Sequence, residues 1–192
     1  MKKILYSSLF ATTLLLGQNE FKLNINNKTL EIAGDVYLNN LYNLNNYTNY
    51  YFTASYMKTQ TEDEDISNRL STVGFKITNS RMNSWGLSFG MGMKAIYSSI
   101  EDTDLMAMPL GLHIQYEPNE MFFFALEGYY SPQVLTFMDA TNYKSGEFSI
   151  NYRILRDGYI YAGFRKIIAE TENSNKEIEF DDNPFFGFRV RF

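Results

Sequence analysis

Cysteine is absent from this 192-residue chain, and histidine occurs once, at His113. Without cysteine the chain is neither a lipoprotein nor a secreted domain held together by disulfides. With no second histidine either, a structural metal site is not expected, and we expect no cofactor. A net charge of -5 excludes the broad basic surface that a nucleic-acid partner would require.

Long apolar runs are also missing beyond the first 17 residues. Residues 2–3 are lysines, and residues 4–16 form an apolar run that is too short to cross a bilayer as a helix. We interpret residues 1–17 as a secretory signal peptide. An exported chain without a later apolar helix is still integral to a membrane if its strands close into a barrel, because closure satisfies the backbone N–H and C=O groups internally.

Aromatic residues are abundant instead. They make up 17% of the chain, with 15 Tyr and 16 Phe, although the mean hydropathy is only -0.30. This combination is typical of an outer-membrane barrel, in which aromatic girdles and alternating strands replace a continuous core. A soluble periplasmic β-barrel is the architectural alternative. Its lumen would be apolar, whereas here the larger apolar side chains lie on the face that we expect to be outside.

The last nine residues alternate apolar and polar side chains up to a terminal phenylalanine. Because strand side chains alternate with a period of two, Gly187, Arg189 and Arg191 share one face. The opposite face consists of Phe186, Phe188, Val190 and Phe192. Such a closing strand is typical of outer-membrane barrels. We therefore predict that these four apolar residues are the assembly signal and that the barrel assembly machinery is a partner.

The same alternation recurs in segments that we predict to be strands. The clearest are residues 85–97, 106–116, 122–130, 147–154 and 160–165, and residues 50–57 and 73–77 are less regular. Pro109 lies within the second segment and removes one hydrogen bond of the ladder, which predicts a β-bulge there.

Connections between these segments alternate in length. Tight turns are expected at residues 79–83, 117–120 and 155–158, and longer, mostly polar loops at residues 59–68, 98–104, 131–142 and 169–183. In outer-membrane barrels the short turns face the periplasm and the long loops face outward. The pattern predicts an all-β fold, namely a transmembrane antiparallel up-and-down β-barrel.

Counting strands back from a periplasmic C-terminus gives about eight and places the barrel at residues 48–192. Residues 18–47 are then an N-terminal segment that is either periplasmic or made of extra strands. Apolar residues at 21, 23 and 25, and again at 30, 32 and 36, form a hairpin-like pattern around Asn26 and Asn27. About ten strands is therefore the alternative count.

Three short motifs carry a family resemblance. Residues 129–137 read YYSPQVLTF, residues 161–165 read YAGFR, and the chain ends in Gly-Phe-x-Val-x-Phe. These motifs resemble the YfaZ family of bacterial outer-membrane proteins. The resemblance implies an outer-membrane barrel in a Gram-negative bacterium, and it brings no set of catalytic residues. An Asn-rich stretch before Tyr50 departs from the family pattern.

The inward faces of the predicted strands carry a candidate network of charges. Its members are Lys76, Lys94, His113, Glu127, Glu147, Arg153, Arg165, Arg189 and Arg191. A barrel of about eight strands is barely wide enough for its own side chains, and unpaired charge inside it would be costly. We therefore predict a largely plugged polar lumen, and a structural role without enzymatic activity.

Two other functions stay open. Six inward bases against two inward acids would suit a narrow, anion-preferring, porin-like channel. A lipid A-modifying enzyme is a further alternative, since His113 and Glu127 could be combined with Ser149 on a neighbouring strand as a hydrolase triad. No local motif supports the triad.

The expected long loops carry most of the acidic residues. Clusters at residues 62–65, 101–104 and 170–182 are predicted to be solvated, with outer-membrane lipids and lipopolysaccharide as the surrounding partners. Residues 131–137 include apolar Val134, Leu135 and Phe137, which either fold over the barrel mouth or form a contact surface, and we favour the lid. We expect a monomer.

Deletion of Phe192 tests the assembly signal. Because the signal peptide and the closing strand act at separate steps, the truncated protein should be exported normally and should insert slowly or not at all. Heat-modifiable mobility of the membrane fraction on gels measures insertion. A normal folded barrel band from the truncated protein would contradict the assignment.

Overall fold

The computed structural model describes residues 18–39, 48–60, 67–79, 85–100, 103–171 and 177–192. The predicted signal peptide at residues 1–17 and the acidic residues 62–65 lie outside these ranges. Nearly all described residues are in strands, as the alternating pattern predicts. No helix in these ranges is long and apolar enough to cross a membrane.

Twelve strands and one 3-10 turn make up the described chain. In order they are β1 (Glu20–Ile25), β2 (Thr29–Tyr37), β3 (Thr48–Gln60), β4 (Ser67–Asn79), β5 (Leu87–Ile100), β6 (Thr103–Ala107), β7 (Leu110–Asn119), β8 (Phe122–Ser131), η1 (Gln133–Leu135), β9 (Thr136–Met138), β10 (Ala140–Leu155), β11 (Gly158–Thr171) and β12 (Glu177–Arg191).

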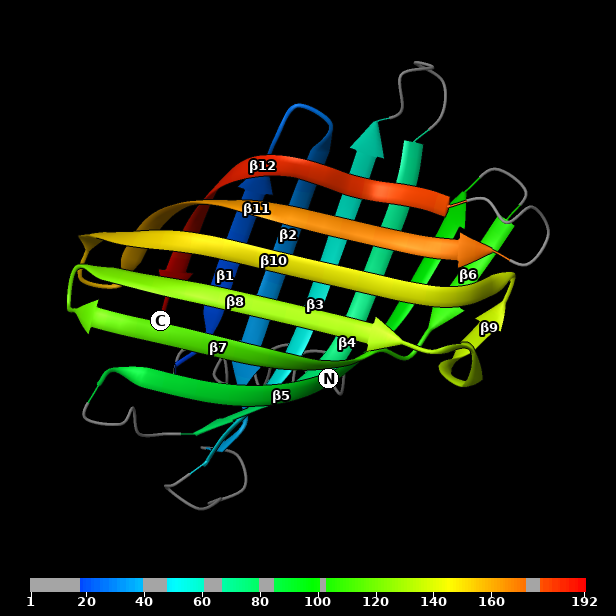
Figure 1. Ribbon diagram of the computed structural model, residues 1–192. Coiled ribbons are helices and arrows are strands. Elements are labelled where there is room, and N and C mark those ends of the chain that lie inside the picture. The colour runs from blue at the N-terminus through cyan, green and yellow to red at the C-terminus, as the bar shows by residue number, and fades with distance from the viewer. Residues whose placement is uncertain (1–17, 40–47, 61–66, 80–84, 101–102, 172–176) are drawn as a thin grey trace, which may run out of the picture.

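Ten of the described strands close into one antiparallel barrel (Figure 1). Around the barrel the order is β1, β2, β3, β4, β5, β7, β8, β10, β11 and β12, and β12 pairs back onto β1 from Glu20↔Arg191 to Ile25↔Phe186. The count of about eight is therefore too low, and the alternative of ten is right. The barrel begins at Glu20 because residues within 18–47 form the hairpin of β1 and β2.

The N-terminal hairpin is set by a short turn. The side-chain carbonyl of Asn26 accepts hydrogen bonds from the backbone N–H groups of Lys28 (2.8 Å) and Thr29 (2.7 Å). Asn is favoured in turns because its side chain replaces a backbone acceptor in this way. The turn fixes the register of β2 against β1 and so directs the acidic side chains of both strands inward.

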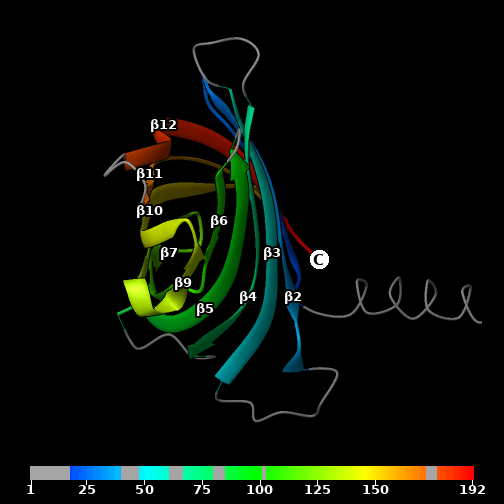
Figure 2. The same ribbon diagram turned by 90° about the vertical axis from the view of Figure 1, so that its right-hand side faces the viewer.

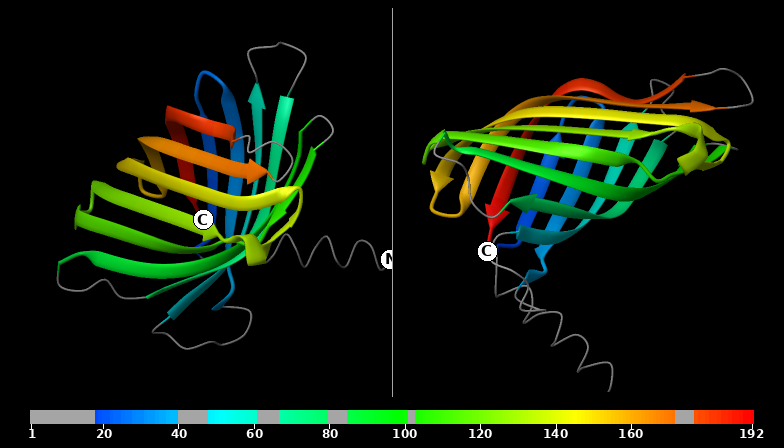
Figure 3. Two further views of the ribbon diagram at one scale, coloured as in Figure 1. Left: turned by 45° about the vertical axis from the view of Figure 1, so that its right-hand side comes forward. Right: turned by 60° about the horizontal axis from the view of Figure 1, so that its bottom comes forward.

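The barrel is formed by two layers of strands that cross. In Figure 1, β7, β8, β10 and β11 pass in front of β1 to β4, β12 curves from the front layer to the back, where it pairs with β1, and Figures 2 and 3 show β5 curving between the two layers. We call the end that carries Glu20 and Arg191 the proximal end. The β7–β8 and β10–β11 turns lie there too, whereas the β1–β2 turn, β6 and β9 lie at the opposite, distal end.

Pro109 interrupts the wall without the expected bulge. Between β6 and β7 the pairing with β5 keeps one register, because Met93 pairs with Leu110 and Ile96 with Ala107. No residue is inserted. Proline lacks the N–H donor of the ladder, but its carbonyl still accepts a hydrogen bond from Lys94 N (3.1 Å).

The distal connections are shorter than predicted. β11 continues to Thr171 and β12 begins at Glu177, so the acidic residues near 170 and 177–182 lie on strands and not in a solvated loop. A register shift opposite Ile167 and Ile168 marks a β-bulge in β12. Bulges redirect side chains, and here both Phe180 and Asp181 are buried.

The apolar segment at residues 131–137 is not a lid. η1 is followed by β9, which pairs with β6 and extends the wall at the distal end. Val134 is 80% exposed, and Phe137 and Met138 are exposed as well. Their side chains therefore do not cover the lumen, because the pairing with β6 holds the segment in line with the wall.

Large apolar side chains project from the outside of the barrel. Met91 is 62% exposed and Leu112 is 64% exposed, and similar residues occupy the outward positions of every barrel strand. So much exposed apolar surface is unfavourable in water. It matches the apolar band of a transmembrane barrel, and the inward faces carry the polar residues.

An arginine placed on each face of β7 tests this assignment. Leu112→Arg should lower the free energy of unfolding by about 2–4 kcal/mol, because the side chain would meet hydrocarbon. The matched variant Gln115→Arg faces the lumen beside Glu117 and should cost less than about 1 kcal/mol. Unfolding in urea from lipid bilayers measures both variants. Equal losses would refute the membrane-facing assignment.

Candidate functional site: the barrel lumen

The lumen contains all the charged residues that strand alternation places there. Buried or partly buried inward positions are occupied by Lys76, Lys94, His113, Glu127, Glu147, Arg153, Arg165, Arg189 and Arg191. Sequence reasoning missed six more that face the same interior, namely Glu20, Lys22, Glu31, Asp35, Glu117 and Asp181.

The added residues remove the expected excess of bases. In the described strands the inward Lys and Arg side chains are matched by as many Asp and Glu side chains. Four of the missed residues come from β1 and β2, which lie in the segment that the sequence predicts to be either periplasmic or made of extra strands. Asp181 had been assigned to a loop, although counting back by twos from Arg189 would have placed it inward.

Arg165 on β11 is at the centre of the deepest network. Its Nε and Nη2 atoms donate to Oδ2 of Asp181 on β12 at 2.9 and 2.8 Å. Nη1 donates to Glu31 on β2, two strands beyond β12, and lies 3.9 Å from Oε2 of Glu147 on β10. The Arg165 and Asp181 side chains are 3% and 0% exposed. This geometry links five consecutive strands of the wall, from β10 to β2, across the place where β12 pairs with β1.

Polar neighbours satisfy the remaining acceptors of this network. Asp181 also accepts from Asn26 Nδ2 (3.0 Å), Thr29 Oγ1 (3.2 Å) and Asn183 Nδ2 (3.0 Å). Glu31 accepts from Asn24 Nδ2 (2.8 Å), and Asn24 in turn accepts from the Tyr161 hydroxyl. Such multiple hydrogen bonding is what allows buried charges to be tolerated.

An apolar cluster fills the lumen near the distal end. Its buried members are Met57, Leu70, Ile96, Leu105, Ala107, Ala140, Tyr143, Ile167, Ala169 and Phe180. These residues come from β3, β4, β5, β6, β10, β11 and β12, so side chains from all around the wall meet there. The lumen is therefore polar only along part of its length.

His113 pairs with Glu127 on the neighbouring strand. His113 Nδ1 is 3.1 Å from Glu127 Oε1, and Lys94 Nζ is 3.8 Å from the other carboxylate oxygen. Ser149 is not part of this group, because its hydroxyl accepts from Asn151 Nδ2 (3.1 Å) and its strand register places it opposite Ala125. The described contacts do not assemble a Ser-His-Glu triad.

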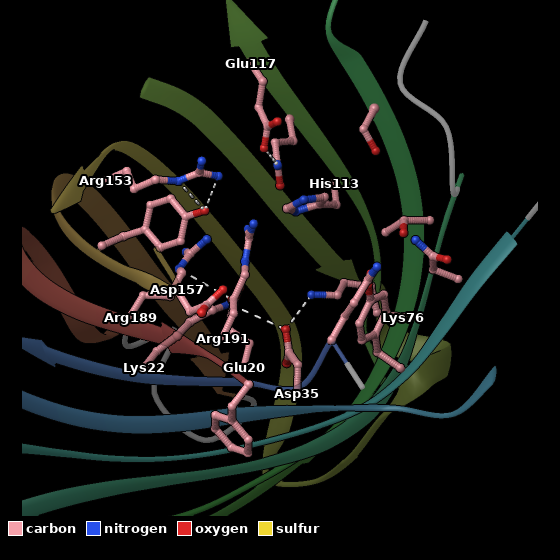
Figure 4. A pocket seen from close by; sticks show the side chains of 18 of the residues that line it. Glu20, Lys22, Asp35, Lys76, His113, Glu117, Arg153, Asp157, Arg189 and Arg191 are labelled. Atoms are coloured by element: carbon pink, nitrogen blue, oxygen red, sulfur yellow. Dashed lines mark hydrogen bonds and ion pairs between the residues drawn. The ribbon is translucent and has the colours of Figure 1, made fainter. Parts of the chain in front are cut away.

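A vestibule of about 470 Å³ opens at the proximal end (Figure 4). Charged side chains from β1, β2, β4, β7, β10 and β12 line it, among them Glu20, Lys22, Asp35, Lys76, His113, Arg153, Arg189 and Arg191. In the described parts of the chain, no three His, Cys, Asp or Glu side chains converge as metal ligands would.

The residues predicted to be the assembly signal lie on the outside of β12. Phe186 and Phe188 are exposed and lie in the part of β12 that pairs with β1. Phe192 exchanges two backbone hydrogen bonds of 3.0 Å with Asn19 beside the start of β1. The closing strand thus presents its aromatic face to the bilayer, and its role in assembly stays a prediction.

Two solved structures of other proteins show similarity to this chain over most of its length. It is similar to the outer-membrane expressed OmpT of Vibrio cholerae, with a TM-score of 0.37, 10% identity, and coverage of 85% of this chain and 56% of that one. It is also similar to an anion-selective porin from Comamonas acidovorans, with a TM-score of 0.39, 8% identity, and coverage of 85% and 49%. The chain thus spans about half of the length of these proteins.

A family model described as YfaZ precursor matches residues 82–192. No curated protein matches the chain. The matched region includes β5 to β12, and with them the closing strand and the YAGFR segment that suggested the family. The chain is a β-barrel protein of the bacterial outer membrane and belongs to the YfaZ family.

Proposed function

We propose that this protein is a structural barrel of the outer membrane whose lumen is closed to solutes, and that it is not an enzyme. The observation that carries the proposal is the buried Arg165 network. Its side chains extend from β11 to β2 and β10, and the Arg165 side chain is only 3% exposed. A solute would have to break several charge-assisted hydrogen bonds to pass.

The distal apolar cluster is a second barrier. Met57 and Phe180 are each 1% exposed, and they come from strands on different parts of the wall. Between this cluster and the vestibule, described residues line two small cavities of about 60 and 70 Å³. Each has room for a few water molecules and not for a continuous hydrated path.

A narrow anion-preferring channel is the second candidate. The observation in its favour is the set of lysines and arginines that line the proximal vestibule. Against it, acids now balance the inward bases, and the vestibule ends at the buried network. An outer-membrane barrel with a blocked lumen acts through its presence in the bilayer, its rims and its binding surfaces.

Conductance in planar bilayers tests the closed lumen. The refolded wild-type protein should show no steady single-channel steps, because both barriers are in place. The triple variant R165S/F180S/D181S removes Arg165 together with its main partner and shortens the apolar cluster, and it should conduct.

The matched control for this experiment is Phe164→Ala, which shortens a side chain on the lipid-facing side of β11, the strand that carries Arg165. It should stay as silent as the wild type. Heat-modifiable mobility verifies that each variant is folded. Large, steady conductance of the wild-type protein would refute the proposal.

A further inference from the structure

The proximal vestibule concentrates positive charge on its walls. Two carboxylates, Glu20 and Asp35, form ion pairs with four cations there. Their ion pairs are Lys22–Glu20 (3.1 Å), Arg189–Glu20 (3.4 Å), Arg191–Glu20 (3.0 Å), Lys22–Asp35 (3.6 Å) and Lys76–Asp35 (2.5 Å). Figure 4 shows these side chains converging on the open space.

Donors therefore exceed acceptors on this wall. Each guanidinium offers five N–H donors and each ammonium three, whereas one carboxylate accepts about four hydrogen bonds. Among the described residues, the buried Nε atom of Arg189 has no hydrogen-bond partner and only the 3.4 Å ion pair with Glu20. The surplus N–H groups are suited to an anionic ligand.

Arg153 adds a further cation. It donates from Nε (3.1 Å) and Nη2 (2.8 Å) to the hydroxyl of Tyr159, and no ion pair joins it to a carboxylate among the described residues. A phenol neutralises none of its charge. Among the cations of the vestibule, Arg153 is thus the strongest candidate for an ion pair with a bound anion.

Aromatic rings hold the three arginines in place. Arg189 lies 5.1 Å from the centre of the Phe123 ring, Arg191 lies 5.2 Å from the same ring, and Arg153 lies 5.3 Å from the Tyr159 ring. The two rings pack edge to face at 5.3 Å. Guanidinium groups stacked in this way are preorganised, so less entropy is lost when an anion binds.

The rim of the vestibule is more balanced. Glu117 accepts a hydrogen bond from Gln115 (2.7 Å), and Asp157 lies with Arg156 in the β10–β11 turn. These acids are on different elements from the arginines of β12 and from Asp35 and Lys76. Glu117 and Asp157 do not remove the surplus, because six Lys and Arg side chains line the vestibule against four Asp and Glu side chains.

We propose that the proximal vestibule is a binding site for a small, soluble molecule with phosphate groups, held chiefly by Arg153 and Arg191. Guanidinium groups match phosphate oxygens in a bidentate manner, and the cavity volume is in the range of small-molecule sites. The vestibule opens at the end that barrels of this class direct to the periplasm, so the ligand comes from that side. Binding requires no passage and is independent of whether the lumen conducts.

Calorimetric titration of the refolded protein in detergent micelles with inorganic pyrophosphate tests the proposal. We expect saturable binding of one pyrophosphate per barrel. Arg153→Gln should weaken binding by at least about tenfold, which corresponds to one charge-assisted hydrogen bond. The substitution leaves no carboxylate without a partner, so the barrel should stay folded. Arg153→Lys keeps the charge but loses the fork, and its affinity should be intermediate.

The matched control is Lys144→Gln, which removes the same charge from the outer surface, where Lys144 pairs with Glu170. Its affinity should equal that of the wild type. Absence of saturable binding would overturn the proposal, and so would an equal loss in Lys144→Gln, which would show non-specific attraction. If Arg153→Gln does not fold, Arg153→Lys decides, since unchanged affinity in that variant contradicts a bidentate contact.

Discussion

The neutralisation of one buried guanidinium, that of Arg165, is the constraint on which the rest of the barrel depends. A buried charge is tolerated only when it is paired and hydrogen-bonded. The partners of Arg165 are on β2, β10 and β12, so strands from both ends of the sequence must be in place at once. The same contacts hold the β1–β2 hairpin against β12, where the barrel closes.

This network also divides the lumen into parts with different chemistry. On the proximal side is a vestibule with a surplus of arginine and lysine, and on the distal side is an apolar cluster that includes Phe180. The bulge in β12 contributes to both the apolar cluster and the Arg165 network, because it directs Phe180 into the cluster and Asp181 to Arg165. The closed lumen that we propose, with a polar vestibule at its proximal end, follows from this arrangement.

Much of the fold is readable from strand alternation, since one face of each strand meets lipid and the other meets the polar lumen. Alternation alone places Lys94, Glu127 and Arg165 inside. It was not enough for β1, because a single barrel strand of six residues is a weak signal even when it alternates regularly. Asp181 was missed because a dense run of acids suggests a solvated loop. In the structure, the buried Arg165 on β11 makes Asp181 its internal counter-charge. Pro109 predicts an irregularity, but the continuous register shows that a strand can lack one N–H donor without an inserted residue.

Comparison of two adjacent aspartates tests the central role of Arg165 most directly. Asp181→Asn leaves the buried guanidinium without its main partner and should lower the free energy of unfolding by about 3–5 kcal/mol. Asp182→Asn removes the same charge one residue away, where Asp182 pairs with the exposed Lys166 (2.6 Å), and should unfold in urea like the wild type. Equal stabilities of the two variants would contradict the account.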